Sequence, residues 1–338
     1  MYRTPSHFRR LLVVTLALSL LAVACGGDDD AGESTTDTTG TAPTEQARGN
    51  IATEFDLADA SVTVGSKEFT EQLILGHMTK LALEATGAEV NDEIGLQGSA
   101  TVRDALTSGA IDLYWEYLGT GWVTHLGNEE GIPGVQEQYE AVRDADLEQN
   151  QIVWLEPTPF NNTYAIAVSD ETAEELGVET IADLADLVEE NPEEATFCAG
   201  GEFATRPDGL PGLEEAYSFE LAPGNISTVD DSLVYTQVDE GETCNFGSVF
   251  STDGRIASLG LTVLEDPENF FPPFNASLNV RQEVYEEIPE LEDLFGPIAE
   301  LLDDETMTGL NAQVAVDGED PEDVARGFLE ENGFIATE

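Results

Sequence analysis

The sequence Asp112-Leu-Tyr-Trp-Glu-Tyr-Leu-Gly-Thr-Gly-Trp122 concentrates four aromatic residues in one short stretch. It predicts a strand over residues 111–114, followed by a loop that contains two glycines. In α/β folds, ligands bind where strands end in such loops. Most aromatic side chains are buried for their large apolar area, so a hydrophobic core is the simpler explanation. The alternative is a ligand site, in which ring faces beside the Thr120 hydroxyl would suit a ligand that is partly apolar and partly charged.

The first 25 residues have the pattern of an export signal. Three arginines precede an apolar run, Leu11 to Val23, which is too short to span a bilayer comfortably. The run ends in Ala-Val-Ala-Cys25 followed by two glycines, which resembles a bacterial lipoprotein signal with Cys25 as the lipidated residue. An ordinary signal peptide, cut after a small residue, is the alternative. Both predict export, and the first anchors the protein to the outer face of the cell membrane through Cys25.

The stretch that follows the signal, residues 26–55, is rich in Asp, Gly, Thr and Ser. Such a composition buries too little apolar surface to offset the entropy of ordering, so this stretch is predicted to be a flexible linker. The remaining residues, 56–338, are enough for two domains.

The charge of the chain excludes several classes of function. The sequence holds 12 Lys and Arg residues against 69 Asp and Glu, a net charge of −57. Binding of nucleic acid needs a basic surface, and attraction to an anionic membrane needs one too, so neither is expected. With only two lysines, Lys67 and Lys80, a basic residue in a loop is more informative here than in an ordinary protein.

The order of the predicted elements indicates an α/β fold. A strand over 62–64, a loop over 65–69 and a helix that Thr70 would cap are followed by a strand over 89–94 and a helix over 99–107. The helix after Thr70 should bury one face, formed by Ile74, Met78, Leu81 and Ala85. Two such β-α-β units in succession predict a mostly parallel sheet flanked by helices.

Two proline-containing breaks divide the rest of the chain. Pro157-Thr-Pro159 and Phe271-Pro-Pro-Phe-Asn275 bracket a middle region with its own strands and helices. This arrangement predicts two lobes joined by two hinge strands, with lobe I over 56–160 and 270–338 and lobe II over 161–269.

The two remaining cysteines, Cys198 and Cys244, lie in strand-like runs of an exported chain. They would form a disulfide if those strands are neighbours, and two buried free thiols are the alternative.

An enzyme is not expected from the motifs. The sequence has no nucleophile elbow, P-loop, dinucleotide-binding glycine motif or zinc-binding H-E-x-x-H. Only His77 and His125 remain after the signal, which poorly supplies a metal site or a catalytic triad. A binding protein without metal or cofactor fits better.

Six motifs, taken in order, carry a resemblance to a known family. They are Gly65-Ser-Lys-Glu-Phe-Thr-Glu-Gln72, Ile111-Asp-Leu-Tyr-Trp-Glu-Tyr-Leu-Gly-Thr120, Asn161-Asn-Thr-Tyr164, Glu202-Phe-Ala-Thr-Arg-Pro-Asp-Gly209, Ser251-Thr-Asp-Gly-Arg255 and Phe271-Pro-Pro-Phe-Asn275. Together they resemble the substrate-binding proteins of osmoprotectant ABC transporters, the glycine betaine, choline and carnitine group. The resemblance covers residues 60–335 and implies a two-lobed, type II-like periplasmic-binding-protein fold with the ligand in the cleft.

The resemblance also implies the residues of the site. The positions that match the family's aromatic box for a quaternary ammonium are Tyr117, Tyr164, Phe250 and Phe274. Aromatic faces attract such a cation, by about 0.5–2 kcal/mol for each well-placed ring. Trp115 is expected to be core instead, because strand alternation directs it away from its neighbours.

At the anionic end of the ligand, the matching positions are Lys67, Thr120 and Arg206, with Asn162 as a further polar contact. Because choline has no carboxylate, the two cations favour glycine betaine. Each assignment has a structural alternative: Lys67 as a solvated loop residue, Arg206 paired with Asp208, and Phe274 as hinge packing.

The resemblance implies the partners as well. We expect a small quaternary amine, with choline, carnitine and ectoine as alternatives to betaine, and the permease subunits of an ABC importer. A monomer without cofactor is expected, attached to the membrane only through its lipid. A ligand sensor with the same cleft is the alternative role.

Overall fold

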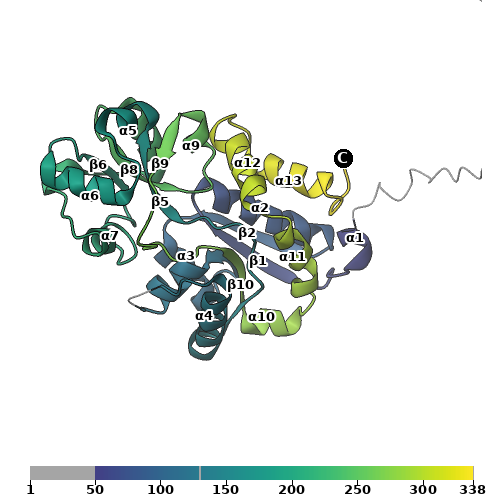
Figure 1. The fold of residues 1–338 in the computed structure, drawn as a ribbon. Helices are drawn as coiled ribbons and strands as arrows, with labels where there is room; N and C mark the ends of the chain where they lie inside the picture. The colour runs from purple at the N-terminus through teal and green to yellow at the C-terminus, as the bar shows by residue number, and fades with distance from the viewer. Residues whose placement is uncertain (1–49, 129–130, 338) are drawn as a thin grey trace, which may run out of the picture. The chain divides into compact units, whose positions relative to one another are not determined.

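The computed structural model describes residues 50–128 and 131–337 (Figure 1). The predicted export signal, its Cys25 and residues 26–49 of the predicted linker lie outside these residues, and so they stay predictions. No helix within the described residues is long and apolar enough to cross a membrane.

The first sheet has the strand order β2-β1-β3-β10-β4. Its strands are β1 (Ser61–Lys67), β2 (Glu89–Leu96), β3 (Leu113–Tyr117), β4 (Ile152–Trp154) and β10 (Ala276–Arg281). β1 is parallel to β2 and to β3, whereas β10 is antiparallel to both of its neighbours. Four of the strands therefore run in one direction and β10 runs against them, which agrees with the prediction of a mostly parallel sheet.

The second sheet repeats this arrangement with the order β7-β6-β8-β5-β9. Its strands are β5 (Tyr164–Ser169), β6 (Phe197–Gly200), β7 (Ile226–Val229), β8 (Phe246–Phe250) and β9 (Leu261–Val263). Here β5 is the antiparallel strand. In each sheet the strand that runs against the others occupies the fourth place, and in each it directly follows one of the two proline-containing breaks.

Helices cover both faces of each sheet. Around the first sheet lie α1 (Ile51–Glu54), α2 (Thr70–Ala85), α3 (Ser99–Ser108), α4 (Val135–Asn150), α10 (Gln282–Glu287), α11 (Leu291–Glu300), α12 (Asp304–Ala315) and α13 (Pro321–Glu331). Around the second lie α5 (Asp170–Leu176), α6 (Ile181–Glu190), α7 (Leu210–Ala216), α8 (Asp231–Glu240) and α9 (Arg255–Ser258). Residues of α3 and α4 pack in a core separate from that of α2, so these helices lie on opposite faces of the first sheet.

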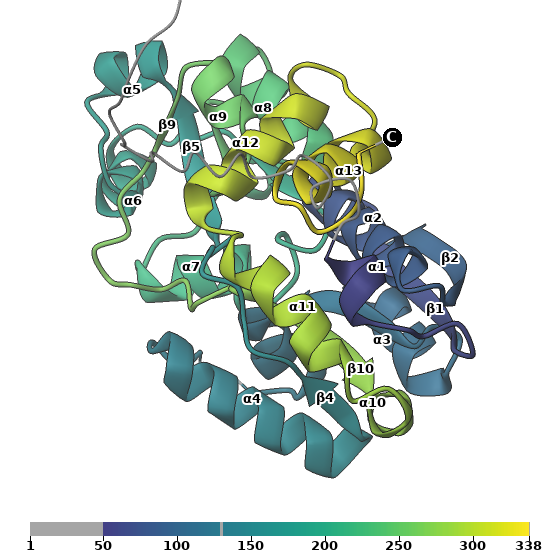
Figure 2. The ribbon, with the colours of Figure 1, turned by 90° about the vertical axis from the view of Figure 1, so that its right-hand side faces the viewer.

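Helix α2 is buried on more than the one face that its sequence predicts. Ile74 and Met78 pack as expected, and Leu75 and Leu83 are buried as well. The reason is that α12 and α13, from the other end of the sequence, lie beside α2 (Figures 1 and 2). The expectation that Thr70 caps this helix is wrong, because the capping position is Phe69 and no side chain caps it.

The two proline-containing breaks run next to each other. Asn161 and Asn275 form an antiparallel bridge, and the Phe274 N–H donates to Asn161 Oδ1 at 2.7 Å. The chain passes here from the first sheet to the second and back. The lobe boundaries at residues 160 and 270 remain predictions, as does the movement of one sheet relative to the other.

Strand β3 differs from its prediction in position. It spans Leu113–Tyr117, so Tyr117 is the last strand residue and points to the same face as Trp115, which is buried as expected. After it the chain forms a short π-helical segment, Thr120–His125. Gly119 is needed for close approach, because a Cβ there would lie 2.7 Å from the Phe274 ring. Strand β1 also continues through Lys67, where a loop was predicted.

The predicted linker ends too late. Residues 51–54 form α1, in which Ile51 is buried against α2. The Ile51 N–H donates to the Phe334 carbonyl at 3.2 Å, so this helix is held against the end of the chain. Ile51 and Phe55, two apolar residues in a polar stretch, pack on the core and begin the folded part here.

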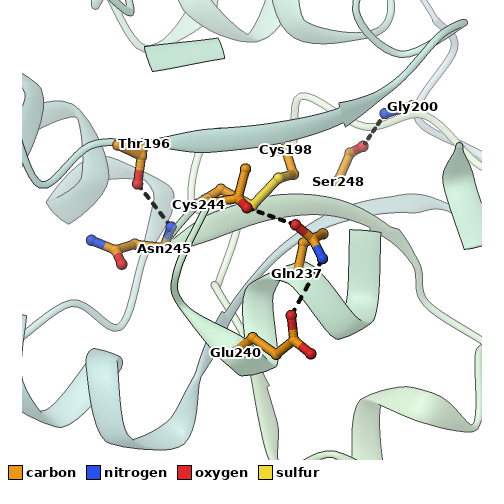
Figure 3. Close-up of a disulfide and its surroundings, with 9 residues drawn as sticks. Thr196, Cys198, Gly200, Gln237, Glu240, Cys244, Asn245 and Ser248 are labelled. Atoms are coloured by element: carbon orange, nitrogen blue, oxygen red, sulfur yellow. Dashed lines mark hydrogen bonds between the residues drawn. A yellow bond between two sulfur atoms is a disulfide. The ribbon is translucent and has the colours of Figure 1, made fainter. Parts of the chain in front are cut away.

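Cys198 and Cys244 form a disulfide, as Figure 3 shows. Cys198 lies in β6 and Cys244 immediately precedes β8, and these two strands are parallel neighbours. The bond closes a loop over 46 positions that contains β7 and α8. It therefore ties β6 to the start of β8, the central strand of the second sheet.

Candidate ligand-binding site

All eight residues that the sequence assigns to ligand binding line one cavity, which has an empty volume of about 530 Å³. They are Lys67, Tyr117, Thr120, Asn162, Tyr164, Arg206, Phe250 and Phe274. The strands of the first sheet supply Lys67 and Tyr117, and those of the second supply Tyr164 and Phe250. Both sheets therefore contribute to one site, at the ends of their strands.

Aromatic rings form a continuous group on one side of the cavity. Tyr164 and Phe250 face each other across the β5–β8 pair, with ring centroids 5.2 Å apart. The Phe274 ring meets Tyr164 edge-on at 5.8 Å. Phe69, which the sequence analysis missed, stacks between Phe250 at 5.2 Å and Tyr117 at 6.1 Å. The sequence could have indicated Phe69 as a site residue, because Phe69 lies in the same motif as Lys67.

Each of the two tyrosines already has a cation over its ring. Lys67 Nζ lies 5.2 Å from the centre of Tyr117, and the Arg206 guanidinium lies 5.6 Å from the centre of Tyr164. Within the described residues, no lysine or arginine lies over the phenylalanine rings of this group. A ligand cation in this cavity would therefore rely mainly on Phe69, Phe250 and Phe274.

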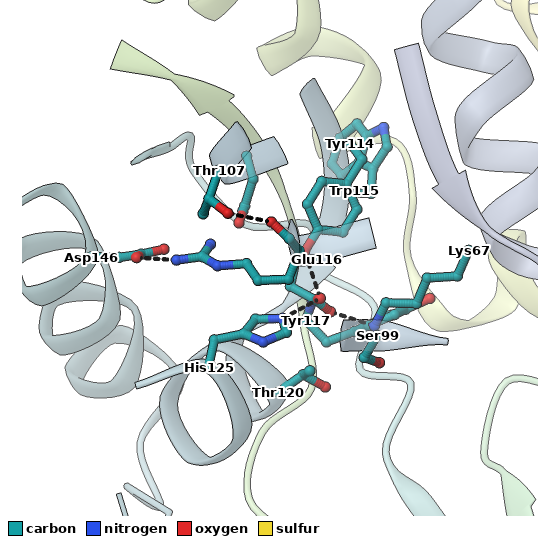
Figure 4. A network of polar contacts seen from close by, with 12 residues as sticks. Lys67, Ser99, Thr107, Tyr114, Trp115, Glu116, Tyr117, Thr120, His125 and Asp146 are labelled. Atoms are coloured by element: carbon teal, nitrogen blue, oxygen red, sulfur yellow. Dashed lines mark hydrogen bonds and ion pairs between the residues drawn. The ribbon is translucent and has the colours of Figure 1, made fainter. Parts of the chain in front are cut away.

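Lys67 belongs to a buried charge network and is no solvated loop residue. Its Nζ donates to Glu116 Oε1 at 2.6 Å, and His125 Nε2 lies 2.8 Å from Glu116 Oε2 (Figure 4). Tyr114 Oη donates to the same oxygen at 2.8 Å. Burial by itself raises the pKa of Glu116, but the charge of Lys67 and the contacts of His125 outweigh it and hold this pKa well below its usual range. Glu116 is thus an anion, and because an anion only accepts, His125 Nε2 donates to it.

Arg206 pairs with Asp208, as the structural alternative predicted, and it also lines the cavity. Its Nε and Nη2 donate to the two carboxylate oxygens of Asp208 at 2.8 and 2.5 Å, in a fork-shaped pair. The same Nη2 lies 3.4 Å from Thr120 Oγ1, and Nη1 donates to Glu202 at 3.3 Å. The guanidinium therefore lines the cavity with its charge already paired.

Glu71 is a second buried carboxylate that the sequence analysis missed. Its Oε1 accepts from Tyr117 Oη at 2.8 Å and from Asn162 Nδ2 at 2.9 Å. Its Oε2 accepts from Thr252 Oγ1 at 2.6 Å and from Asn311 Nδ2 at 2.9 Å. Burial raises the pKa of Glu71, and these four hydrogen bonds only partly oppose the rise. Glu71 thereby fixes two residues of the cavity wall, Tyr117 and Asn162.

Asn162 has an unused acceptor. It is 4% exposed, and within the described residues its Oδ1 accepts no hydrogen bond. A buried polar atom without a partner is costly unless a ligand or water satisfies it.

Further acidic groups complete the wall: Glu68, Glu202 and Asp231. Burial raises the pKa of Asp231 to about 6, and the neighbouring carboxylates, chiefly Glu202, add to this rise. The cavity thus combines ring faces with two paired cations and an excess of carboxylates. The described residues contain no group of His, Cys, Asp and Glu that would hold a metal ion.

Two mixed β-sheets, each flanked by helices and both lining one cavity, define the class of two-lobed substrate-binding proteins. Comparison with known structures gives the same class. Apo YehZ from Escherichia coli matches with a TM-score of 0.61 and 33% identity, over 81% of this chain and 99% of that one.

The family follows from the sequence comparison. A model of the substrate-binding domain of ABC-type glycine betaine transport systems matches residues 60–331. This chain belongs to that family of transporter substrate-binding domains, which are not enzymes. The glycine-betaine-binding protein of Pseudomonas aeruginosa is 39% identical over 285 residues, which cover 82% of this chain and 90% of that protein. The ergothioneine transport permease/ergothioneine binding protein EgtU of Helicobacter pylori is 34% identical, over 82% of this chain and 49% of its own length.

Proposed function

We propose that this protein captures a small quaternary-ammonium osmoprotectant, glycine betaine first among them, and delivers it to the permease of an ABC importer. The observation that carries the proposal is the single cavity to which both sheets contribute aromatic rings and cations. In it, the ligand's ammonium lies against Phe69, Phe250 and Phe274, which attract a cation that has no N–H to donate. The ligand's carboxylate lies toward Thr120 and Arg206.

Capture closes the cavity. Because residues from both sheets are needed to surround the ligand, binding favours the arrangement in which the two sheets approach, with the paired proline-containing breaks as the hinge. The closed form is the one that docks on the permease. Lipidation at Cys25 keeps the protein at the outer face of the membrane, close to that permease, and the binding unit acts as a monomer.

Calorimetric titration with glycine betaine and with choline tests the proposal directly. We expect saturable binding with one ligand per chain. Phe250→Ala should weaken binding at least about tenfold, because it removes one ring face from the cavity. Phe55→Ala is the matched control, since Phe55 is half-buried like Phe250 and lies outside both the cavity and the two proline-containing breaks. Equal losses in the two variants, or no binding by a folded sample, would refute the proposed site.

A second candidate ligand is a cation without a carboxylate, such as choline. The pairing of Lys67 with Glu116 and of Arg206 with Asp208 favours it, because neither cation has a free charge for a ligand anion. The same pair of titrations separates the two: tight choline binding with weak betaine binding would select this candidate and keep the aromatic site.

A further inference from the structure

A carboxylate of the protein itself lies on anion-binding donors of the cavity. Glu202, which follows β6 of the second sheet, accepts from the Ser99 N–H at 2.7 Å and from Ser99 Oγ at 2.9 Å. It also accepts from Arg206 Nη1 at 3.3 Å. Both Ser99 and Arg206 line the cavity. These contacts resemble those that a bound small carboxylate would make.

The donors are well suited to an anion. Ser99 begins α3, a ten-residue helix, and the free N–H groups and dipole at a helix N-terminus favour negative charge. The guanidinium of Arg206 is paired with Asp208, but its Nη1 still offers N–H groups that a carboxylate can accept. Burial opposes the charged form of Glu202, yet the charges of Lys67 and Arg206 and the Ser99 hydrogen bonds lower its pKa below the usual value. Glu202 is therefore an anion at neutral pH.

Glu202 is also able to leave this position. Its side chain is 38% exposed, whereas that of Asp208, the other partner of Arg206, is 5% exposed. Asp208 holds the guanidinium through two hydrogen bonds without help from Glu202. Displacing Glu202 thus leaves Arg206 in place and frees Ser99 and Arg206 Nη1.

We propose that Glu202 is a specificity-determining residue that competes with the ligand's carboxylate for Ser99 and Arg206. The proposal rests on the function proposed above and adds the basis of its selectivity. A zwitterion such as glycine betaine has to displace Glu202 from these donors, or bind beside it against charge repulsion. Choline, which has no carboxylate, binds with Glu202 in place. Glu202 therefore lowers the affinity for betaine relative to choline.

Titration of the wild type, Glu202→Ala and Glu202→Gln with both ligands tests this role. We expect Glu202→Ala to strengthen betaine binding about tenfold and to change choline binding about threefold or less, with Glu202→Gln between it and the wild type. The matched control is Glu220→Gln, which removes the same charge from an exposed residue between α7 and β7. This variant should leave the ratio of the two affinities unchanged.

The ratio of betaine affinity to choline affinity distinguishes a role of Glu202 in specificity from a purely structural role. Glu202 also links the second sheet to α3, so a purely structural loss would weaken both ligands in the same proportion, and that result would overturn the proposal. Weaker betaine binding with unchanged choline binding would overturn it as well, while leaving the proposed function intact. Betaine binding that appears only in Glu202→Ala would support it. Binding of neither ligand by any of the four proteins would overturn both the competition and the proposed function.

Discussion

Glu71 in α2 and Glu116 in β3 are both buried, but their hydrogen-bond partners carry different charges. Glu116 is 0% exposed and contacts a lysine and a histidine; Glu71 is 2% exposed and contacts only neutral donors. The pKa of the first is lowered and that of the second is raised. Burial opposes ionisation of both, so the partners alone decide the direction.

The charge of Glu116 is neutralised by a buried partner, whereas a charge on Glu71 would not be. Glu116 neutralises Lys67, and the pair contributes little net field to the cavity. Glu71 has no cation partner among its hydrogen bonds, yet its donor Tyr117 is a wall of the cavity. An ionised Glu71 therefore places an uncompensated negative charge behind the aromatic rings, where it would attract the ligand cation proposed above.

The largest effect is expected from Glu116→Gln. It leaves Lys67, which is 4% exposed, without its counter-charge. Breaking a buried ion pair in this way costs about 3–5 kcal/mol, so the free energy of unfolding should fall by this amount in denaturant titrations. Glu175→Gln, at an exposed position, is the control and should change stability by about 0.5 kcal/mol or less. A loss of similar size in both variants would show that Glu116 holds no buried pair.

The second effect is on binding. Glu71→Gln removes the charge but strands no cation. Within the described residues the side-chain oxygens of Asn162 and Asn311 accept no hydrogen bond, so either amide can turn its oxygen toward the new amide of residue 71. We expect a stability change of about 1 kcal/mol or less. Choline binding should weaken about tenfold, because the field behind the rings is lost. Unchanged choline affinity in calorimetry would mean that Glu71 is neutral in the folded protein.

The sequence predicted the cavity's rings and cations but not this distinction. The motifs located Lys67, Tyr117 and Arg206 because each lies within a recognisable local pattern. The partner of Lys67 lies 49 positions away, and one donor to Glu71 lies 240 positions away. Among 69 acidic residues, only the fold decides which carboxylate meets a cation. The same reason explains why the contact between Glu202 and Ser99 was not predicted.

The third prediction concerns pH. Because the pKa of Glu71 is raised, the folded state holds its proton above pH 4.5 where the unfolded state does not, and stability falls as pH rises through this window. The pKa of Glu116 is lowered, so its contribution is full above about pH 4.5 and is lost as pH falls. Relative to the wild type, Glu71→Gln should gain stability with rising pH above 4.5, and Glu116→Gln should gain it with falling pH below 4.5. Each slope is at most about 1.4 kcal/mol per pH unit, measured by unfolding at matched salt. Slopes of the same sign would contradict the contrast between the two sites.

The smallest effect is expected from Tyr117→Phe. The change keeps the ring of the cavity wall and removes one of the four hydrogen bonds to Glu71. Since that bond lowers the pKa of Glu71, its loss should raise this pKa further and cost about 1 kcal/mol of stability at neutral pH, with choline binding within about threefold of the wild type. Tyr285→Phe is the matched control, because Tyr285 donates to Glu292 at 2.7 Å at the surface, where water replaces the bond. A stability loss in Tyr117→Phe no larger than in the control would mean that three donors hold Glu71 as well as four. The hydrogen bond from Tyr117 would then contribute less to stabilising the Glu71 carboxylate than its length of 2.8 Å suggests.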